Sequence, residues 1–243
     1  MANILFDQYW ETVQSLMDES LKRNAERIDT IAPLIAESLG KGDMLHVFGS
    51  GHSAMVAAEI VNRAGGLVPV NLLRDPTNGW AETISGYGSR LFDRYAKFYG
   101  ARQGEFIVIV SNSGRNPSPI DVALRAKEAG LRVIALTALE VSRAAASNHP
   151  SGKRLFEVAD YVLDNLGIPG DAAVPLDGGS TKVGPTSTFT GALLLNRLAL
   201  EVTGIMAAGG GPLPILTSAN VEGGREANEK LYERYRGRLS NSI

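Results

Sequence analysis

Phe106–Gly114 reads FIVIVSNSG, in which five apolar residues are followed at once by small polar ones. An unbroken apolar run of this length predicts a strand that is buried on both faces, as in parallel sheets. A helical pattern, Pro119–Ala129, comes soon after. In an open parallel sheet, ligands bind beyond the carboxyl ends of the strands. The segment therefore predicts an α/β fold and places a binding loop at Ser111–Asn116.

The same alternation continues on both sides of this segment. The expected strands are Met44–Phe48, Val68–Leu73, Phe106–Val110, Val133–Thr137 and Tyr161–Leu163. The expected helices are Ser53–Ala64, Arg90–Tyr99, Pro119–Ala129, Val141–Ala146, Thr188–Thr203 and Ala219–Arg236. Alternating strands and helices form a parallel, doubly wound sheet with helices on both faces. We therefore expect a single sheet domain over residues 41–243, with the last two helices added to it.

Residues 1–40 precede the sheet and carry apolar side chains at helical spacing from Ile4 to Leu39. Pro33 lacks a backbone donor and clashes with the preceding turn, so it predicts a break. Asp29 or Thr30 would cap a second helix. We expect a helical extension that packs on the core or on a partner subunit.

The composition excludes several classes of protein. Twenty-four basic and 26 acidic residues give a net charge of −2, and no segment concentrates Lys and Arg, so a nucleic-acid partner is not expected. Cysteine is absent, which excludes disulfides and thiolate chemistry. No His, Asp and Glu residues stand at metal-ligand spacing, and no cofactor is expected. The N-terminus does not resemble a signal peptide and no apolar run approaches about 20 residues, which favours a cytoplasmic protein without a membrane span.

Three loops share one design, in which small hydroxyl residues and glycine stand directly before a helix: Gly49–Ser53, Ser111–Asn116 and Gly184–Thr190. Free N–H groups at a helix start attract anions, and glycine lets a ligand approach the backbone. Each loop alone is better explained as an N-cap, but three together favour an anionic or polyol ligand. The predicted binding residues are Gly49, Ser50, Gly51, Ser53, Ser111, Asn112, Ser113, Gly114, Asn116, Thr186 and Ser187. Lys182 joins them from a long segment, Gly167–Val183, that we expect to close over the site.

A dinucleotide site is the main alternative for the first loop. Gly49, Gly51 and Ala54 fit the fingerprint G-x-G-x-x-G/A between a strand and a helix. Asp75 would accept a ribose hydroxyl about 20 residues later, with Arg74 beside it for a phosphate. A dinucleotide site, however, has no need of the two further serine- and threonine-rich loops.

These loops resemble the motifs of the sugar isomerase (SIS) domain family. Gly49-Ser50-Gly51-His52-Ser53 is similar to the family's G-x-G-x-S, and Ser111-x-Ser113-Gly114 to its S-x-S-G-x-T. Phe92–Ala138 is similar in layout to sedoheptulose-phosphate isomerases, and Gly184–Ala199 resembles a loop and helix of arabinose-phosphate isomerases. The resemblance covers roughly Ile28–Val202.

The resemblance implies a three-layer αβα sandwich with a five-stranded, flavodoxin-like sheet that assembles into dimers or tetramers. It also implies that Ser111 and Ser113 bind the phosphate of a sugar phosphate and that Ser53 lines the sugar pocket. This chain departs from the second motif because Asn116 stands where the family has Thr. An amide still donates a hydrogen bond, so phosphate binding is expected with altered geometry.

Aldose–ketose isomerisation needs a base beside the carbon that loses its proton and a group that moves the hydroxyl proton. Glu82, in a polar segment after the second strand, is the preferred base. Glu59 is the second candidate because sedoheptulose-phosphate isomerases carry a functional Glu on the equivalent helix, although the spacing here is shorter. His52 in the first loop is suited to shuttling a proton. The remaining histidines and one further carboxylate have structural interpretations: His46 in the core, His149 in a surface turn, and Glu105 before a strand.

The sequence thus predicts a homo-oligomer that binds a sugar phosphate or amino-sugar phosphate and isomerises it. Two alternatives stay open: a non-catalytic sugar-phosphate sensor and a lyase acting on a phosphorylated amino-sugar ether. Membership of such a family defines the ligand class more closely than the reaction.

Overall fold

The computed structural model describes residues 2–176 and 179–240. Its centre is a parallel sheet of five strands in the order β2-β1-β3-β4-β5. The strands are β1 (Leu45–Gly49), β2 (Val70–Leu73), β3 (Phe106–Val110), β4 (Arg132–Thr137) and β5 (Tyr161–Asp164). This order is that of flavodoxin-like folds, whose switch point lies between β1 and β3. The predicted α/β class and five-stranded parallel sheet are confirmed.

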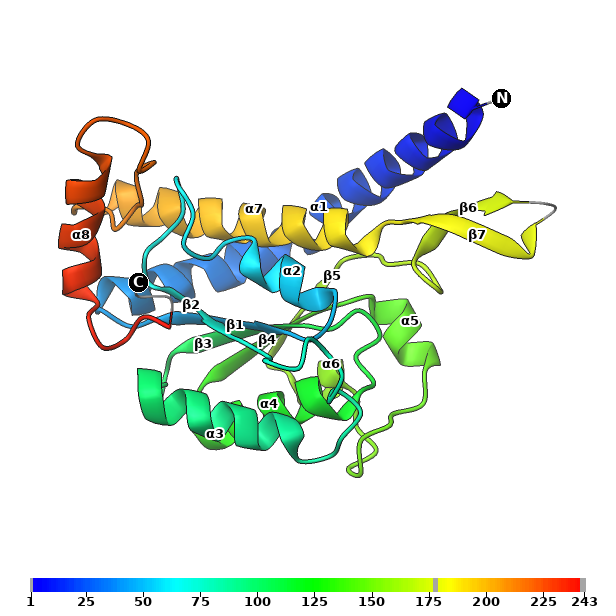
Figure 1. Ribbon diagram of the computed structural model, residues 1–243, viewed down its shortest axis with the longest axis horizontal. Coiled ribbons are helices and arrows are strands. Elements are labelled where there is room, and N and C mark those ends of the chain that lie inside the picture. Colours follow the sequence, from blue (N-terminus) through cyan, green and yellow to red (C-terminus); the bar gives the residue numbers. More distant parts are fainter. Residues whose placement is uncertain (1, 177–178, 241–243) are drawn as a thin grey trace.

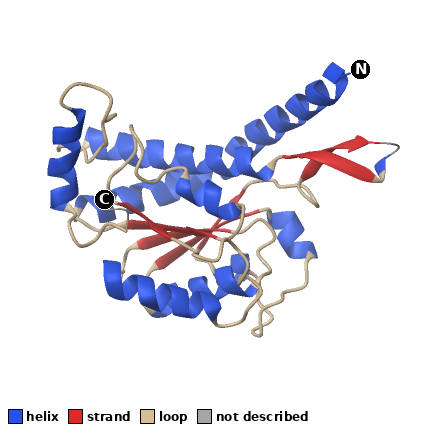
Figure 2. Ribbon diagram, viewed as in Figure 1, coloured by secondary structure: helices blue, strands red, loops and turns tan. Residues whose placement is uncertain are grey.

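Helices cover both faces of the sheet, which gives three layers (Figures 1 and 2). One layer contains α1 (Ala2–Gly40), α2 (Ser53–Ala58) and α7 (Ser187–Ala208). The other contains α3 (Tyr87–Tyr99), α4 (Pro117–Glu128) and α6 (Leu155–Val158), while α5 (Leu139–Ala144) follows β4. The central strand β3 shows why both faces need cover: Val108 packs into the first layer's core, and Ile107 and Ile109 pack into the second.

The strand register brings the first two predicted loops together. Gly49, the last residue of β1, is paired with Val110, the last residue of β3. The loops that follow therefore start side by side at the switch point of the sheet. This is where the topology predicts a ligand site.

The prediction of two N-terminal helices is wrong, because α1 continues through Pro33. Proline removes one intrahelical hydrogen bond and costs about 3 kcal/mol inside a helix. Ile28, Ile31 and Ile35 lie on both sides of it, and none of them has any exposed surface. Pro33 itself is on the exposed side, where helices tolerate bending best. Burial of the apolar stripe against α7 and β5 therefore outweighs the cost of the proline. The division of the chain into a helical extension, residues 1–40, and a sheet domain, residues 41–243, stays a prediction.

The expected insertion Gly167–Val183 is in large part an antiparallel hairpin, which the sequence analysis missed. Its strands are β6 (Ala172–Leu176) and β7 (Thr181–Pro185). The hairpin projects away from the sheet beside the N-terminal half of α1 (Figure 1). Tyr9 of α1 donates a hydrogen bond to the carbonyl of Pro185 at 2.6 Å and packs edge-on against Phe189. The hairpin thus extends the α1 layer, whereas Ile168, Gly170 and Asp171, which precede it in the predicted segment, lie at the strand ends.

The last helix, α8 (Gly224–Arg234), is shorter than predicted. It lies at the end of the molecule that is opposite to the β6–β7 hairpin (Figure 1). The segment that follows it contributes Tyr235 and Leu239 to a small cluster with Met44, Val68 and Leu216. This cluster covers the start of β1 and of the segment leading into β2.

By length and composition α7 could cross a membrane, which the sequence analysis did not anticipate. Only 28% of its most apolar window is buried within the chain, so several large side chains face outward. Phe189 and Leu200 are 50% and 69% exposed. The helix also carries Arg197 and Glu201, and its inner face packs along α1.

Candidate functional site

A cavity of about 630 Å³ runs along the carboxyl edge of the sheet. Residues after all five strands line it, and several come from the first two predicted loops. Those that the sequence analysis named are Ser50, Gly51, His52, Ser53, Glu82, Ser111, Asn112, Ser113 and Asn116. Side chains far apart in the sequence therefore meet at the position where doubly wound sheets bind ligands.

The loop after β3 offers donors that the protein itself leaves unused. Among the described residues, no acceptor takes the backbone N–H groups of residues 112–116, and the hydroxyl of Ser113 also has no partner. Gly114 makes the turn with a φ of 60°, and a Cβ there would lie 2.5 Å from the hydroxyl oxygen of Ser142. A run of free amide groups in a tight turn forms a concave anion site.

The donors come from this loop and not from the start of α4, contrary to expectation. Pro117 and Pro119 have no N–H, and the N–H of Ser118 donates to the backbone carbonyl of Glu82 at 2.9 Å. The first turn of α4 therefore has little left to offer an anion except its dipole. The backbone N–H of Ser118 and the side-chain amide of Asn116 instead tie the second loop to the segment that carries Glu82.

Glu82 is half-buried at the cavity wall, where its Oε1 accepts a hydrogen bond from the Asn116 amide at 2.8 Å. Burial raises the pKa of this carboxyl group above its usual value, and the nearby charge of Asp75 raises it further. Hydrogen bonds from Ser50 and Asn116 offset only part of this rise. A carboxyl group whose pKa is moved toward neutrality suits proton transfer.

Asp75 organises the first loop and the segment after β2. Its carboxylate accepts five hydrogen bonds, from the hydroxyls of Ser50, Thr77 and Tyr87 and from the N–H groups of Thr77 and Gly79. Burial alone would raise the pKa of Asp75, but these bonds outweigh it and lower the pKa. A carboxylate has about four acceptor positions, so no capacity remains for a ribose hydroxyl. The geometry therefore disfavours the dinucleotide alternative.

The third predicted loop does not line the cavity. The N–H groups of Thr186 and Ser187 donate to the Asp171 carboxylate at 3.1 and 2.8 Å, and the Ser187 hydroxyl donates to it at 2.8 Å. The chain's own carboxylate thus caps α7 and occupies the donors that were expected to hold an anion. The sequence shows these donors, but Asp171, the acceptor that satisfies them, stands 15 residues earlier in the chain.

Other predicted residues lie beside or away from the cavity. Gly49 and Gly114 support the loops from behind; a Cβ on Gly49 would lie 2.3 Å from the carbonyl oxygen of Ser53. Lys182 is exposed on β7, opposite Pro175. Glu59, at the end of α2, pairs with Arg63 and accepts a hydrogen bond from Asn196 at 3.1 Å. A catalytic role for Glu59 stays a prediction, and it has no cavity contact within one chain.

Trp80 is a site residue that the sequence analysis did not single out. It lines the cavity and is 90% exposed. The available signal was a large aromatic residue inside a polar, glycine-containing segment.

His149 is also placed differently from expectation. Its side chain is only 9% exposed, and Nε2 lies 3.1 Å from Asp121 of α4, so it anchors its turn rather than facing solvent. Over residues 2–176 and 179–240, no group of three or more His, Asp or Glu side chains could hold a metal ion.

Comparison with known proteins defines the class. The model of the SIS domain matches residues 8–138, more than half of the chain. The chain therefore belongs to the SIS domain family. UPF0309 protein lmo0025 of Listeria monocytogenes is 39% identical over 231 residues, which cover 95% of this chain and 97% of that protein.

Solved structures share the fold at low sequence identity. A phosphoheptose isomerase from Francisella tularensis has a TM-score of 0.57 and 18% identity, covering 83% of this chain and 98% of its own. The Vibrio vulnificus NanR protein complexed with ManNAc-6P has a TM-score of 0.53 and 16% identity, covering 93% of this chain and 67% of its own. At these identities the likeness supports the fold alone.

Proposed function

We propose that this protein binds a sugar phosphate or amino-sugar phosphate along the carboxyl edge of its sheet and isomerises it. The observation that carries the proposal is the shared cavity of the second loop and Glu82. A phosphate dianion needs several donors arranged around it, and the N–H groups of residues 112–116 with Ser111 and Ser113 supply them. Glu82 then lies in the same cavity, within reach of the sugar chain.

The proposed reaction is a proton transfer between neighbouring carbons. Glu82 removes the proton from the carbon next to the carbonyl, which leaves an enediol, and returns it to the carbon that carried the carbonyl. The hydroxyl proton moves to the former carbonyl oxygen at the same time, and we assign that shuttle to His52, which lines the cavity. No electrons leave the substrate, so neither oxidant nor cofactor is needed.

The two other functions differ from this one in what they require. A sensor needs the phosphate loops but no base, and a lyase needs a base together with an acid for its leaving group. The raised pKa of Glu82 favours a catalytic function, because a purely structural carboxylate gains nothing from it.

We also propose a cytoplasmic homo-oligomer. The exposed apolar side chains of α7, Phe189 and Leu200, support a second copy as their cover. Light scattering of the purified protein in the absence of detergent tests this assembly. A monodisperse monomer, or a protein that needs detergent to stay dispersed, would contradict it.

The first experiment is a thermal-shift screen against sugar phosphates, their unphosphorylated parents and NAD(P). A ligand that binds only the native state raises Tm. We expect stabilisation by one or more phosphosugars and by none of the parent sugars. Stabilisation by NAD(P) alone would show that the first loop is a dinucleotide site. Each stabilising sugar phosphate is then incubated with the protein and followed by NMR for aldose–ketose conversion.

Ser113→Ala tests the second loop. Loss of one hydrogen bond to a charged phosphate should weaken binding of the stabilising phosphosugar by about 1.5–3 kcal/mol, measured by calorimetry. Ser180→Ala, on the exposed hairpin, is the matched control and should bind like the wild type. Equal affinity of both variants would place the phosphate elsewhere.

A further inference from the structure

Asn112 lies just beyond the end of β3, and the oxygen and the nitrogen of its side-chain amide have different surroundings. Its Oδ1 accepts a hydrogen bond from Nδ2 of Asn165 at 3.1 Å. Its own Nδ2 has no acceptor among the described residues, and it is not enclosed, because Asn112 lines the cavity. One half of the amide is thus held by the protein and the other half is available to a ligand.

A backbone donor determines which half is available. The N–H of Gly167 donates to Oδ1 of Asn165 at 3.0 Å, and an N–H group cannot act as an acceptor. The Asn165 amide therefore has one orientation, with Nδ2 toward Asn112. Asn112 must then present its oxygen to Asn165 and its NH₂ group to the cavity. Although amide orientations are ordinarily interchangeable, this pair is fixed from one end.

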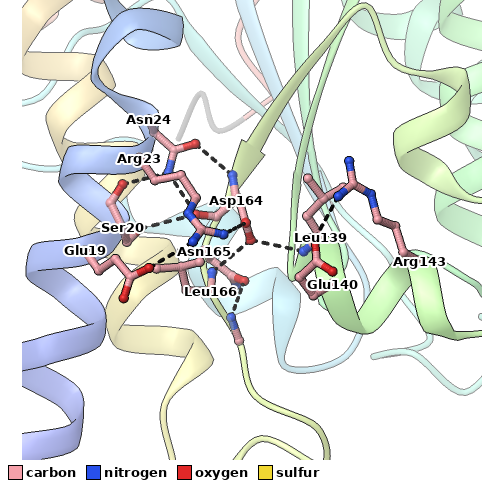
Figure 3. A network of polar contacts seen from close by, with 11 residues as sticks. Glu19, Ser20, Arg23, Asn24, Leu139, Glu140, Arg143, Asp164, Asn165 and Leu166 are labelled. Carbon is pink, nitrogen blue, oxygen red and sulfur yellow. Dashed lines mark hydrogen bonds and ion pairs between the residues drawn. The ribbon is translucent and has the colours of Figure 1, made fainter.

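Asp164, the residue before Asn165, holds this arrangement in place (Figure 3). Asp164 is 1% exposed, and its Oδ1 accepts the N–H groups of Leu139 and Leu166, both at 3.0 Å. Its backbone N–H and carbonyl both bond to the side chain of Asn24 on α1 at 2.8 Å. The turn after β5 is therefore attached to α1 on one side and to α5 on the other. It cannot shift without breaking several buried hydrogen bonds.

The fit around Asn112 is close. A Cβ on Gly167 would lie 2.6 Å from Oδ1 of Asn112, so only glycine allows the amide to occupy this position. Asn165 is itself 2% exposed and has no access to a ligand.

We propose that Asn165 is a positioning residue, which fixes the Asn112 amide so that its NH₂ group donates to the anionic phosphate of the substrate. The proposal rests on the proposed phosphate role of the second loop. Without Asn165, the Asn112 amide is free to turn its oxygen toward the phosphate, which repels it.

A double-mutant cycle tests this coupling, with inorganic phosphate as the probe and its Kd measured by ³¹P NMR titration. Asn165→Leu keeps the approximate volume and adds no charge. We expect it to weaken phosphate binding about 2- to 12-fold, which is less than the loss of a hydrogen bond to a charged phosphate, because the Asn112 amide is still present and only its orientation is freed. In the Asn112→Ala background the same substitution should change Kd by less than about 2-fold, because the amide it orients is gone.

Asn165→Asp provides a second, isosteric variant. Its carboxylate still accepts the N–H of Gly167 but now also accepts from Asn112, which reverses that amide. Binding should fall further than in Asn165→Leu. Asn71→Asp is the matched control, since Asn71 is also buried and bonds one backbone carbonyl and one N–H far from the cavity. Thermal unfolding of each variant checks the fold.

The outcomes separate the two proposals. If the wild-type protein binds phosphate and Ser113→Ala weakens that binding, the proposed phosphate role of the second loop is supported. An Asn165→Leu variant that binds normally, or weakens binding equally with and without Asn112, would then overturn the positioning role alone. Failure of the wild type to bind phosphate or any phosphosugar would overturn the proposed function itself.

Discussion

Glu82 and Glu105 lie at opposite ends of the same sheet, and their environments shift their pKa values in opposite directions. Glu105 precedes β3 and has no exposed side-chain surface. Its carboxylate accepts from the backbone N–H groups of Met44 and Arg102, from His46 at 2.9 Å and from Arg238 at 2.6 Å. Burial would raise the pKa of Glu105, but the hydrogen bonds from His46, Arg102 and Arg238 outweigh it and lower the pKa to about 2.

Glu82 is less buried than Glu105, yet its pKa is raised, because only Ser50 and Asn116 compensate for its desolvation. The number of donors, and not the depth of burial, decides the direction of the shift. The amino end of the sheet is a closed network in which every carboxylate oxygen is satisfied. The carboxyl edge leaves backbone donors free and the desolvation of one carboxyl group only partly compensated, which favours a ligand there.

The largest effect should come from Glu82→Gln. Removing the base should lower the rate of phosphosugar isomerisation by about 10²- to 10⁴-fold while phosphosugar binding persists. Because burial disfavours the charged form of Glu82, the neutral glutamine should leave Tm unchanged or slightly higher. Steady-state kinetics and calorimetry check both parts, and a variant with wild-type turnover would remove Glu82 from the mechanism.

Glu105→Gln should produce the opposite pattern. It leaves Arg238 without its charged partner inside the protein, and breaking a buried pair costs about 3–5 kcal/mol. Urea unfolding should show this loss, whereas phosphosugar affinity per folded molecule should be retained. Unchanged stability would mean that the amino-end network contributes nothing to the fold.

The pH dependence of stability follows from the lowered pKa of Glu105. A carboxyl group whose pKa falls on folding stabilises the protein above its unfolded value, 4.5, and that contribution is lost as the pH falls toward about 2. The wild type should therefore be more stable than Glu105→Gln at neutral pH, and the difference should shrink across this window. A difference that is constant from pH 7 to pH 2.5 would contradict the assignment.

The smallest effect should come from Asp171→Asn, which weakens the cap of α7. Asparagine tolerates the positive φ of 63° at this position and keeps one acceptor, but it loses the charge that interacts with the helix dipole. We expect the free energy of unfolding to fall by about 0.3–1 kcal/mol with no loss of phosphate affinity. Markedly weaker phosphate binding would contradict this expectation and indicate that the third loop contributes to the phosphate site.

Local patterns were sufficient for the sheet and for two of the three loops. The run Phe106–Val110 predicted the limits of β3 without error, because an unbroken apolar run made mostly of β-branched residues favours a strand covered on both faces. His46 was placed in the core and is fully buried against Tyr95 and Glu105. These features depend on residues that are close in the chain, so the sequence displays them directly.

Features that depend on distant partners were decided by the tertiary structure. The sequence by itself determined that Ser111–Asn116 follows a buried strand and that Glu82 stands in a polar segment after the second strand. Only packing decided that α1 continues through Pro33, since the compensating burial comes from α7. Likewise, only the fold brought Asp171 to the donors of Thr186 and Ser187, and Asn165 to Asn112. A hydrogen bond between residues 15 or 53 positions apart leaves no local pattern, because either partner alone is equally consistent with a free, ligand-binding side chain.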